Sequence, residues 1–280
     1  MEQLIKDILL KKELKNLDYK IVQSELKKYF KKNEKIFLSL TKNSYNKRSS
    51  NYKITIKDVR KKLREIYGVF IEEKYSKKEE LLSKITAKNK DKILREILSL
   101  HKSSKERIPY YKKIYKKIFE ITKKPESILD LACGLNPLSY EWLGCKPRYV
   151  ASDISSKDLS FIQTFFNKIK IKGETERIDL TENIDYIQKK KFDICFLFKA
   201  LDSIEARNRH ASKKIIEKIN SDWIVVSFSK VSLGGGKEIK KSKRNWFVNF
   251  LKKNNYHYEE FEIPNEYFIV VKKTIRQEKT

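Results

Sequence analysis

The sequence predicts an α/β fold in which a mostly parallel, Rossmann-like sheet follows an all-helical N-terminal domain. Two observations lead to this prediction. Apolar residues repeat at helical spacing through the first hundred residues, where glycine and proline are nearly absent. From Ser127 onward, short apolar runs alternate with helical patterns, as they do when parallel strands are joined by helices. We therefore expect a helical domain over residues 1–100 and a sheet domain over residues 101–280.

The helical domain is predicted from apolar side chains that recur every three or four residues over 4–30, 59–70 and 81–98. The polar segment 41–52 is expected to be a loop. Residues 106–121 predict one further helix that connects the two domains. Its basic face carries Lys112, Lys113, Lys116 and Lys117.

Seven strands are expected in the second domain, and the last two should form a hairpin around Pro264-Asn265-Glu266. Parallel strands that end in an antiparallel hairpin are typical of a class I methyltransferase sheet. In that fold, Asp179 would lie beside an adenine ring. The expected strands are 127–132, 148–153, 175–179, 192–198, 222–228, 257–263 and 267–272.

The segment from Glu126 to Ser155 predicts a nucleotide-binding unit made of a strand, a tight glycine turn, a helix and a second strand. Ala132 and Gly134 are small enough to let a ligand approach the backbone. Asp153 follows Gly134 by about twenty residues, the spacing at which such units present a carboxylate to ribose hydroxyls. Because no GxGxxG pattern is present, S-adenosylmethionine fits this turn better than a dinucleotide does. The alternative is an ordinary strand–helix–strand unit of another α/β protein.

Charge indicates the partner. The chain of 280 residues contains 64 Lys and Arg against 37 Asp and Glu, a formal net charge of +27. Residues 1–125 hold 36 of the basic and 16 of the acidic side chains, so most of the excess lies in the N-terminal part. Such an excess favours binding to a polyanion, because each phosphate contact releases condensed counterions. Lysine-rich composition can also come from an AT-rich genome, and lysine runs often form a solvated helix face.

The remaining composition indicates a protein of the reducing cytoplasm. Cys133, Cys145 and Cys195 are odd in number and form no CxxC pattern, so neither a disulfide framework nor a zinc site is expected. The three histidines are too scattered for a metal centre. No apolar run approaches the length of a membrane span, so we expect no membrane association. We expect a monomer.

Three segments together reveal a family resemblance. HKSSKERIP at 101–109 precedes LDLACGLNPL at 129–138, and SFSKVSLGGGK follows at 227–237. This combination resembles the aminoglycoside-resistance 16S rRNA (guanine-N7) methyltransferases. The resemblance covers roughly residues 100–272, and the first hundred residues match only in being helical and basic. It implies an S-adenosylmethionine-dependent enzyme that acts on small-subunit rRNA and binds the ribosome through its N-terminal domain.

The resemblance also implies roles for individual residues. Arg107 would pair with the methionyl carboxylate of the cofactor, although a surface ion pair with Glu106 or a neighbour is the alternative. Ser104 would assist it, or would simply cap a helix. Lys199 would lie near the target base, and Glu205 also matches the family, although both could be solvated charges. Ala132 and Gly134 would line the cofactor, Asp153 would hold its ribose, and its adenine would be framed by Asp179 and Leu180.

The segment at 227–233 departs from the family pattern, which usually has a proline after the phenylalanine and a lysine one position later than Lys230. These changes touch the target-base side, where Lys230 is expected to contact RNA with the four lysines of the connecting helix. The resemblance implies guanine N7 methylation. The absence of the amino-methylation motif at 198–201 and of a cysteine placed as a nucleophile is consistent with that product. Alternatives are a methyltransferase of tRNA or another rRNA base, or a non-catalytic RNA-binding or ribosome-assembly protein.

Overall fold

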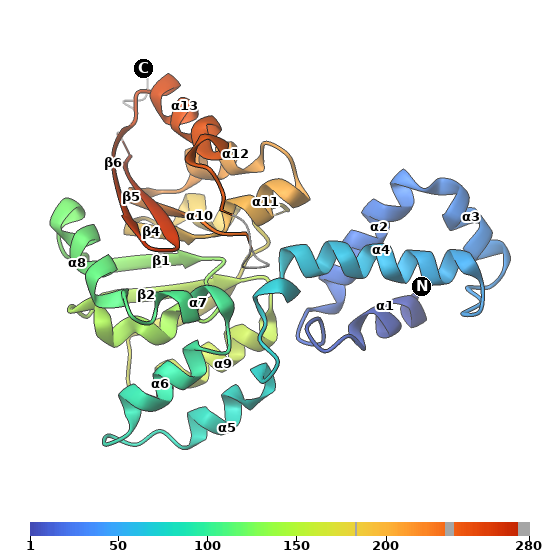
Figure 1. Ribbon diagram of the computed structural model, residues 1–280, viewed down its shortest axis with the longest axis horizontal. Coiled ribbons are helices and arrows are strands. Elements are labelled where there is room, and N and C mark those ends of the chain that lie inside the picture. Colours follow the sequence, from blue (N-terminus) through green and yellow to red (C-terminus); the bar gives the residue numbers. More distant parts are fainter. Residues whose placement is uncertain (183, 233–237, 274–280) are drawn as a thin grey trace.

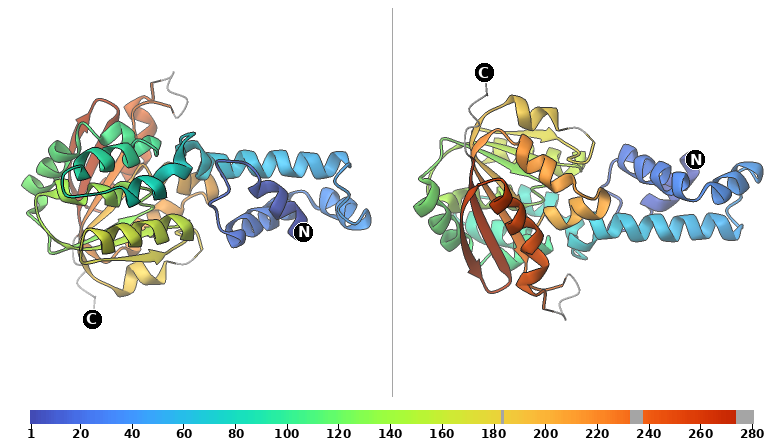
Figure 2. Two further views of the ribbon diagram at one scale, coloured as in Figure 1. Left: turned by 90° about the horizontal axis from the view of Figure 1, so that it is seen from below. Right: turned by 90° about the horizontal axis from the view of Figure 1, so that it is seen from above.

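The computed structural model describes residues 1–182, 184–232 and 238–273. It consists of a helical body that projects from one side of a larger sheet-containing body (Figure 1). The projection is elongated in both views of Figure 2. Within the described part of the chain, no helix combines the length and the apolar character that crossing a membrane requires.

The helical body has its own hydrophobic core. Its helices bury one face each, and side chains such as Leu26, Tyr52 and Leu63 meet between them. Helix α4 starts at a capped end, because the side-chain oxygen of Ser49 accepts a hydrogen bond from the backbone N–H of Tyr52 at 3.2 Å. The four helices are α1 (Glu2–Leu9), α2 (Tyr19–Lys32), α3 (Glu34–Lys42) and α4 (Ser50–Ile66).

Six short helical segments connect this body to the sheet. Leu82 of α5 and Ile97 of α6 are buried in the same core as Ile128 and Phe166, so these helices pack with the sheet. This packing leads us to propose a domain division near residue 70 rather than at residue 100. The segments are η1 (Gly68–Phe70), η2 (Tyr75–Lys77), α5 (Lys78–Ser83), α6 (Lys90–Leu98), α7 (Lys102–Arg107) and α8 (Tyr111–Thr122).

The single connecting helix expected over 106–121 is wrong. The chain forms α7 and α8 instead, and the break includes Pro109. Proline has no N–H to donate to the helical hydrogen-bond ladder, and its ring crowds the carbonyl group one turn before it. The turn at Gly134 likewise leads into a 3-10 helix, η3 (Asn136–Leu143), rather than an α-helix.

The predicted α/β class is confirmed. Within the described residues, seven strands form one sheet in the order β3-β2-β1-β4-β5-β7-β6. The first five are parallel, and β7 runs antiparallel between β5 and β6. Strand β3 lies two residues earlier than expected, which leaves Asp179 beyond its end. The strands are β1 (Ser127–Leu131), β2 (Arg148–Asp153), β3 (Gly173–Arg177), β4 (Phe192–Phe198), β5 (Ser221–Ser229), β6 (His257–Ile263) and β7 (Glu266–Lys272).

Helices cover both faces of the sheet (Figure 2). One buried core lies against α5, α6, α8 and α9, and a second lies on the opposite face against α10 to α13. The parallel strands therefore present their carboxyl ends at one edge, and the helical body contacts the sheet domain there through α4 and α11. The remaining helices are α9 (Ser156–Lys168), α10 (Asp185–Lys189), α11 (Leu201–Arg207), α12 (Ala211–Lys218), η4 (Lys241–Arg244) and α13 (Asn245–Lys253).

A buried polar cluster joins the end of α4 to the start of α9. The Tyr67 hydroxyl donates a hydrogen bond to the Asp158 carboxylate, and the Lys78 amine lies 3.4 Å from the other oxygen of that carboxylate. The Asp158 and Lys78 side chains are each 2% exposed. A buried charge without a partner is costly, so a movement of the helical body that broke the Tyr67–Asp158 contact would be unfavourable. The cluster therefore fixes how the helical body meets the sheet domain.

Replacing Tyr67 with phenylalanine should lower the free energy of unfolding by about 1–3 kcal/mol, because the Asp158 carboxylate loses a donor in a buried site. The change is measured by urea denaturation without cofactor. Tyr29→Phe is the matched control, because its hydroxyl donates to Asp58 at 3.1 Å near the surface and its loss should cost under about 0.5 kcal/mol. Equal losses in the two variants would contradict the importance of the buried cluster.

Candidate functional site

The turn after β1 has unusual backbone geometry. Ala132 and Gly134 both have a φ of +51°, in the left-handed region. A Cβ atom at Gly134 would lie 2.8 Å from the His101 ring, so glycine is needed there for space as well as for conformation. Asp130, at the end of the strand, is buried and accepts hydrogen bonds from Tyr149 at 2.6 Å and Asn136 at 2.9 Å. These contacts tie the end of β1 to Asn136, which follows the turn, and to the neighbouring strand β2.

Asp153 ends β2 and faces this turn. One carboxylate oxygen accepts the Gly134 backbone N–H at 3.0 Å, and the other accepts those of Ile154 at 2.7 Å and Ser155 at 3.2 Å. Burial raises the pKa of the Asp153 carboxyl to about 6, although the three backbone donors counteract it. The ends of β1 and β2 are therefore tied together by one carboxylate.

A pocket opens at this edge of the sheet. Its walls include six of the sequence-predicted residues: Arg107, Ala132, Gly134, Asp153, Leu180 and Lys199. Its other walls were not predicted. Ile66, Tyr67 and Phe70 close it from the end of α4 and from η1, and Arg207 reaches it from α11. No local pattern marks these four residues, because they reach the pocket from segments far from the glycine turn in the sequence.

Two predicted cofactor residues lie outside the pocket walls. Ser104 is 1% exposed, with its hydroxyl 3.5 Å from His101 Nδ1, and its neighbour Ser103 lines the pocket instead. Asp179 faces Arg207, whose two terminal nitrogens donate to its oxygens at 2.6 and 2.9 Å. Burial alone would raise the pKa of Asp179, but the Arg207 guanidinium outweighs it and holds the pKa below its ordinary value.

Arg107 forms a buried ion pair, but with a partner that the sequence analysis did not consider. Its Nε donates to both oxygens of Glu266 at 2.9 Å, and Glu266 is fully buried at the start of β7. Burial would lower the pKa of the guanidinium, but Glu266 keeps it above its ordinary value. The Nη2 atom lies 2.8 Å from Glu266 yet forms no well-aligned hydrogen bond. The buried guanidinium of Arg107 also lines the pocket.

Lys199 follows β4 in a left-handed conformation, with a φ of +54°. Its backbone N–H donates to the Ser227 hydroxyl at 3.0 Å. Its amine donates to Glu106 and lies 3.5 Å from Glu266, so the side chain is a buried, paired cation rather than a solvated one.

Glu205, in contrast, contacts backbone groups outside the pocket. It accepts the backbone N–H groups of His210 at 2.7 Å and Ser212 at 2.9 Å and so caps the start of α12.

The lysines predicted to contact RNA lie apart from one another. Lys112, Lys113 and Lys116 are exposed on α8, on the side of the sheet domain away from the helical body (Figure 1). Lys117 lies 5.4 Å from the centre of the Phe261 ring. Lys230 pairs with Glu262 at 3.0 Å beyond the end of β5. Residues 233–237, which end the 227–237 segment, lie outside the described residues.

The pocket chemistry suits a ligand with both apolar and charged parts. His101 is half-buried and stacks on Phe70 with ring centres 5.7 Å apart. Burial lowers its pKa to about 3, so the ring is neutral at physiological pH. Burial also raises the pKa values of the Cys133 and Cys195 thiols well above the ordinary value, so neither is a ready nucleophile. Among the described residues, no group of side chains has the arrangement of a metal site.

Known proteins share both sequence and fold with this chain. The model of the family described as "Ribosomal RNA methyltransferase (FmrO)" matches residues 44–271. A 16S rRNA (guanine(1405)-N(7))-methyltransferase from Micromonospora echinospora is 31% identical over 228 residues, which are 78% of this chain and 82% of that protein. The enzyme of the same name from Micromonospora rosea is 30% identical over 229 residues, with the same two shares.

Solved structures agree on the fold. The 16S rRNA methyltransferase RmtF, in complex with S-adenosyl-L-homocysteine, aligns with a TM-score of 0.75 and 23% identity over 97% of this chain and 98% of its own. The 16S rRNA methylase RmtB aligns with a TM-score of 0.71 and 20% identity over 98% of each chain. The resemblance inferred from segments 101–109 and 129–138 is thus confirmed, and the chain belongs to the ribosomal RNA methyltransferase (FmrO) family.

Proposed function

We propose that the protein transfers a methyl group from S-adenosylmethionine to N7 of one guanine in small-subunit rRNA, the nucleotide that corresponds to the one in the names of its Micromonospora relatives. The observation that carries the proposal is the pocket itself. It brings the turn at Gly134, the carboxylate of Asp153 and the guanidinium of Arg107 together with the buried amine of Lys199.

The residues in this pocket fit the cofactor. Asp153 offers ionised oxygens to the ribose hydroxyls, and Arg107 offers the guanidinium that lines the pocket to the methionyl carboxylate. Ala132 and Gly134 let the ligand approach the backbone, and Leu180 supplies an apolar wall for the adenine. Asp179 would act on the adenine side only through the segment that it holds, because its carboxylate is engaged with Arg207.

The reaction asks little of the protein beyond placement. The cofactor supplies a methyl group on a positively charged sulfur, and guanine N7 has a lone pair that needs no proton removed. The task of this chain is therefore to align the two and to exclude water, which is catalysis by proximity. Within the described residues, the pocket has no thiolate, because burial keeps Cys133 protonated. Lys199 would position the target base from its place between Glu106 and Glu266.

RNA affinity is assigned to the helical body and to α8. Residues 1–70 contain 19 basic and 8 acidic side chains, and Ile66, Tyr67 and Phe70 at the end of this stretch line the pocket. The exposed Lys112, Lys113 and Lys116 form a second basic surface on α8. We propose that both surfaces contact the rRNA of the small subunit, with a strong dependence on salt concentration.

Cofactor affinity should fall as the pH drops through about 6, because ribose hydroxyls bind the ionised Asp153 better than its protonated form. The pKa of Asp153 in the folded protein lies above its ordinary value, so the unliganded fold favours the protonated carboxyl. This contribution to the free energy of unfolding is lost as the pH rises through about 6. Titration calorimetry with S-adenosylhomocysteine between pH 5.5 and 7.5 measures the effect.

Asp153→Asn should bind about tenfold or more weakly at pH 7.5 and lose this pH dependence, because an amide replaces a charged acceptor worth about 1.5–3 kcal/mol. Glu176→Gln, on the neighbouring strand and outside the pocket, is the control and should behave as the wild type does. A pH profile that persists in Asp153→Asn would assign the titration to another group.

Replacing Lys199 with methionine should reduce turnover about 100-fold, because the target base loses a positioning cation. The dissociation constant of S-adenosylhomocysteine should change by less than about threefold if Lys199 lies on the base side of the pocket. Lys191→Met removes an exposed amine paired with Asp222 at 3.1 Å and serves as the control. A loss of cofactor affinity as large as the loss of turnover would move Lys199 to the cofactor side.

The product decides the central proposal. N7 methylation places a positive charge on the base and makes its glycosidic bond labile, so borohydride and aniline treatment should cut the modified rRNA at a single guanosine. Small subunits methylated by the purified protein supply the RNA, and a bacterial host that expresses it should gain aminoglycoside resistance. Methyl incorporation without strand cleavage would mean that a different atom is methylated.

A further inference from the structure

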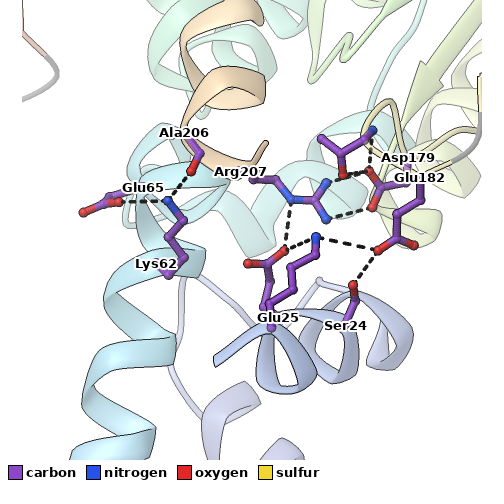
Figure 3. Close-up of polar contacts among 10 residues, drawn as sticks. Ser24, Glu25, Lys62, Glu65, Asp179, Glu182, Ala206 and Arg207 are labelled. Carbon is purple, nitrogen blue, oxygen red and sulfur yellow. Dashed lines mark hydrogen bonds and ion pairs between the residues drawn. The ribbon is translucent and has the colours of Figure 1, made fainter. Parts of the chain in front are cut away.

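A buried charge network joins the helical body to one wall of the pocket (Figure 3). Its centre is Arg207, the last residue of α11, whose side chain is 4% exposed. The two terminal nitrogens of Arg207 hold Asp179, and its Nε donates to Glu25 of α2 at 3.2 Å. One guanidinium therefore binds both bodies at once.

The Asp179 end of the network holds the pocket wall in shape. One oxygen of Asp179 accepts the backbone N–H of Thr181 at 3.0 Å and its hydroxyl at 2.8 Å. Ile178, Leu180 and Thr181 all line the pocket, and Arg207 lines it as well. The segment on which the adenine is proposed to rest is thus shaped by the same carboxylate that Arg207 binds.

The Glu25 end of the network belongs to the helical body. The Glu25 side chain is 5% exposed and also pairs with Lys28 at 3.1 Å. Lys28 reaches Glu182 at 3.8 Å, and the Ser24 hydroxyl donates to Glu182 (Figure 3). Glu182 directly follows the wall segment. Within the described residues, Glu25 does not line the pocket, so it can affect a ligand there only through Arg207 or its neighbours.

We propose that Arg207 and Glu25 are positioning residues that couple cofactor binding to the placement of the helical body. Separation of α2 from α11 removes one of two carboxylates from a buried guanidinium, and the Asp179 contact and the wall at 178–181 then rearrange. Docking on the small subunit, which holds the helical body in place, raises cofactor affinity. By linkage, bound cofactor raises affinity for the small subunit by the same factor. The coupling to small-subunit binding rests on the proposed function.

The test measures S-adenosylhomocysteine binding to the intact chain by calorimetry. Glu25→Ala should weaken it about 5–20-fold, a typical range for coupling between sites, although Glu25 lies outside the pocket. Glu25→Gln keeps an acceptor for the Arg207 Nε and should recover part of the loss. Asp18→Ala is the matched control, because Asp18 also joins the two bodies, through Arg177 at 2.7 Å and Ser156, and neither of these lines the pocket. Its affinity should stay within about twofold of the wild type.

A second measurement distinguishes coupling from simple loss of stability. Affinity for the small subunit is determined with and without saturating S-adenosylhomocysteine. The affinity with the cofactor product divided by the affinity without it should exceed one for the wild type and approach one for Glu25→Ala. Wild-type cofactor affinity in Glu25→Ala, or an equal loss in Asp18→Ala, would overturn the proposal. If the wild type fails to bind the small subunit at all, the proposed function fails. The calorimetric comparison still decides whether Glu25 acts on the pocket.

Discussion

The Asp153 carboxylate is the contact on which the pocket depends. It accepts one backbone N–H from the turn after β1 and two from the start of the loop after β2, so it closes the carboxyl ends of two parallel strands around a common centre. Backbone donors compensate the cost of burying this group, and they hold Gly134 in a conformation that would be strained for other residues. Asp153 thereby fixes the positions of Gly134 and Ile154, which line the pocket together with Asp153 itself.

Buried charges then join segments that are remote in the sequence. Arg107 with Glu266, Lys199 with Glu106, and Arg207 with Asp179 each bring together two different elements at the same edge of the sheet. Such pairs contribute little net stability, because desolvation offsets their attraction, but removal of one partner leaves a costly charge. Their effect is to fix geometry. They place the cationic side chains where a carboxylate and a nucleotide would meet them, and they hold the wall at 178–181 against α11.

The sequence predicted the fold well, since strand periodicity and the glycine turn are local signals. It placed six strands closely and β3 two residues late, because the apolar Ile178 and Leu180 lie beyond the strand, where they line the pocket. It treated 106–121 as one helix although Pro109 breaks it. The pocket residues on the glycine turn and on β2 could be predicted, because both belong to the single strand–turn–helix–strand segment from Glu126 to Ser155, in which their spacing along the sequence is characteristic. Glu266, Tyr67 and Arg207 could not, because their positions depend on packing between distant elements.

The pairing of Arg107 with Glu266 has a consequence for biosynthesis. The two residues are separated by 159 positions, and Glu266 belongs to the strand that completes the sheet between β5 and β6. Contacts of such long range form late and slow folding. On the translating ribosome, every recognisable motif of the pocket emerges before the residue that neutralises Arg107. A nascent chain that stops short of residue 266 therefore carries the whole glycine turn and Asp153 but has an uncompensated cation at its centre, so the site becomes competent only when the hairpin has closed.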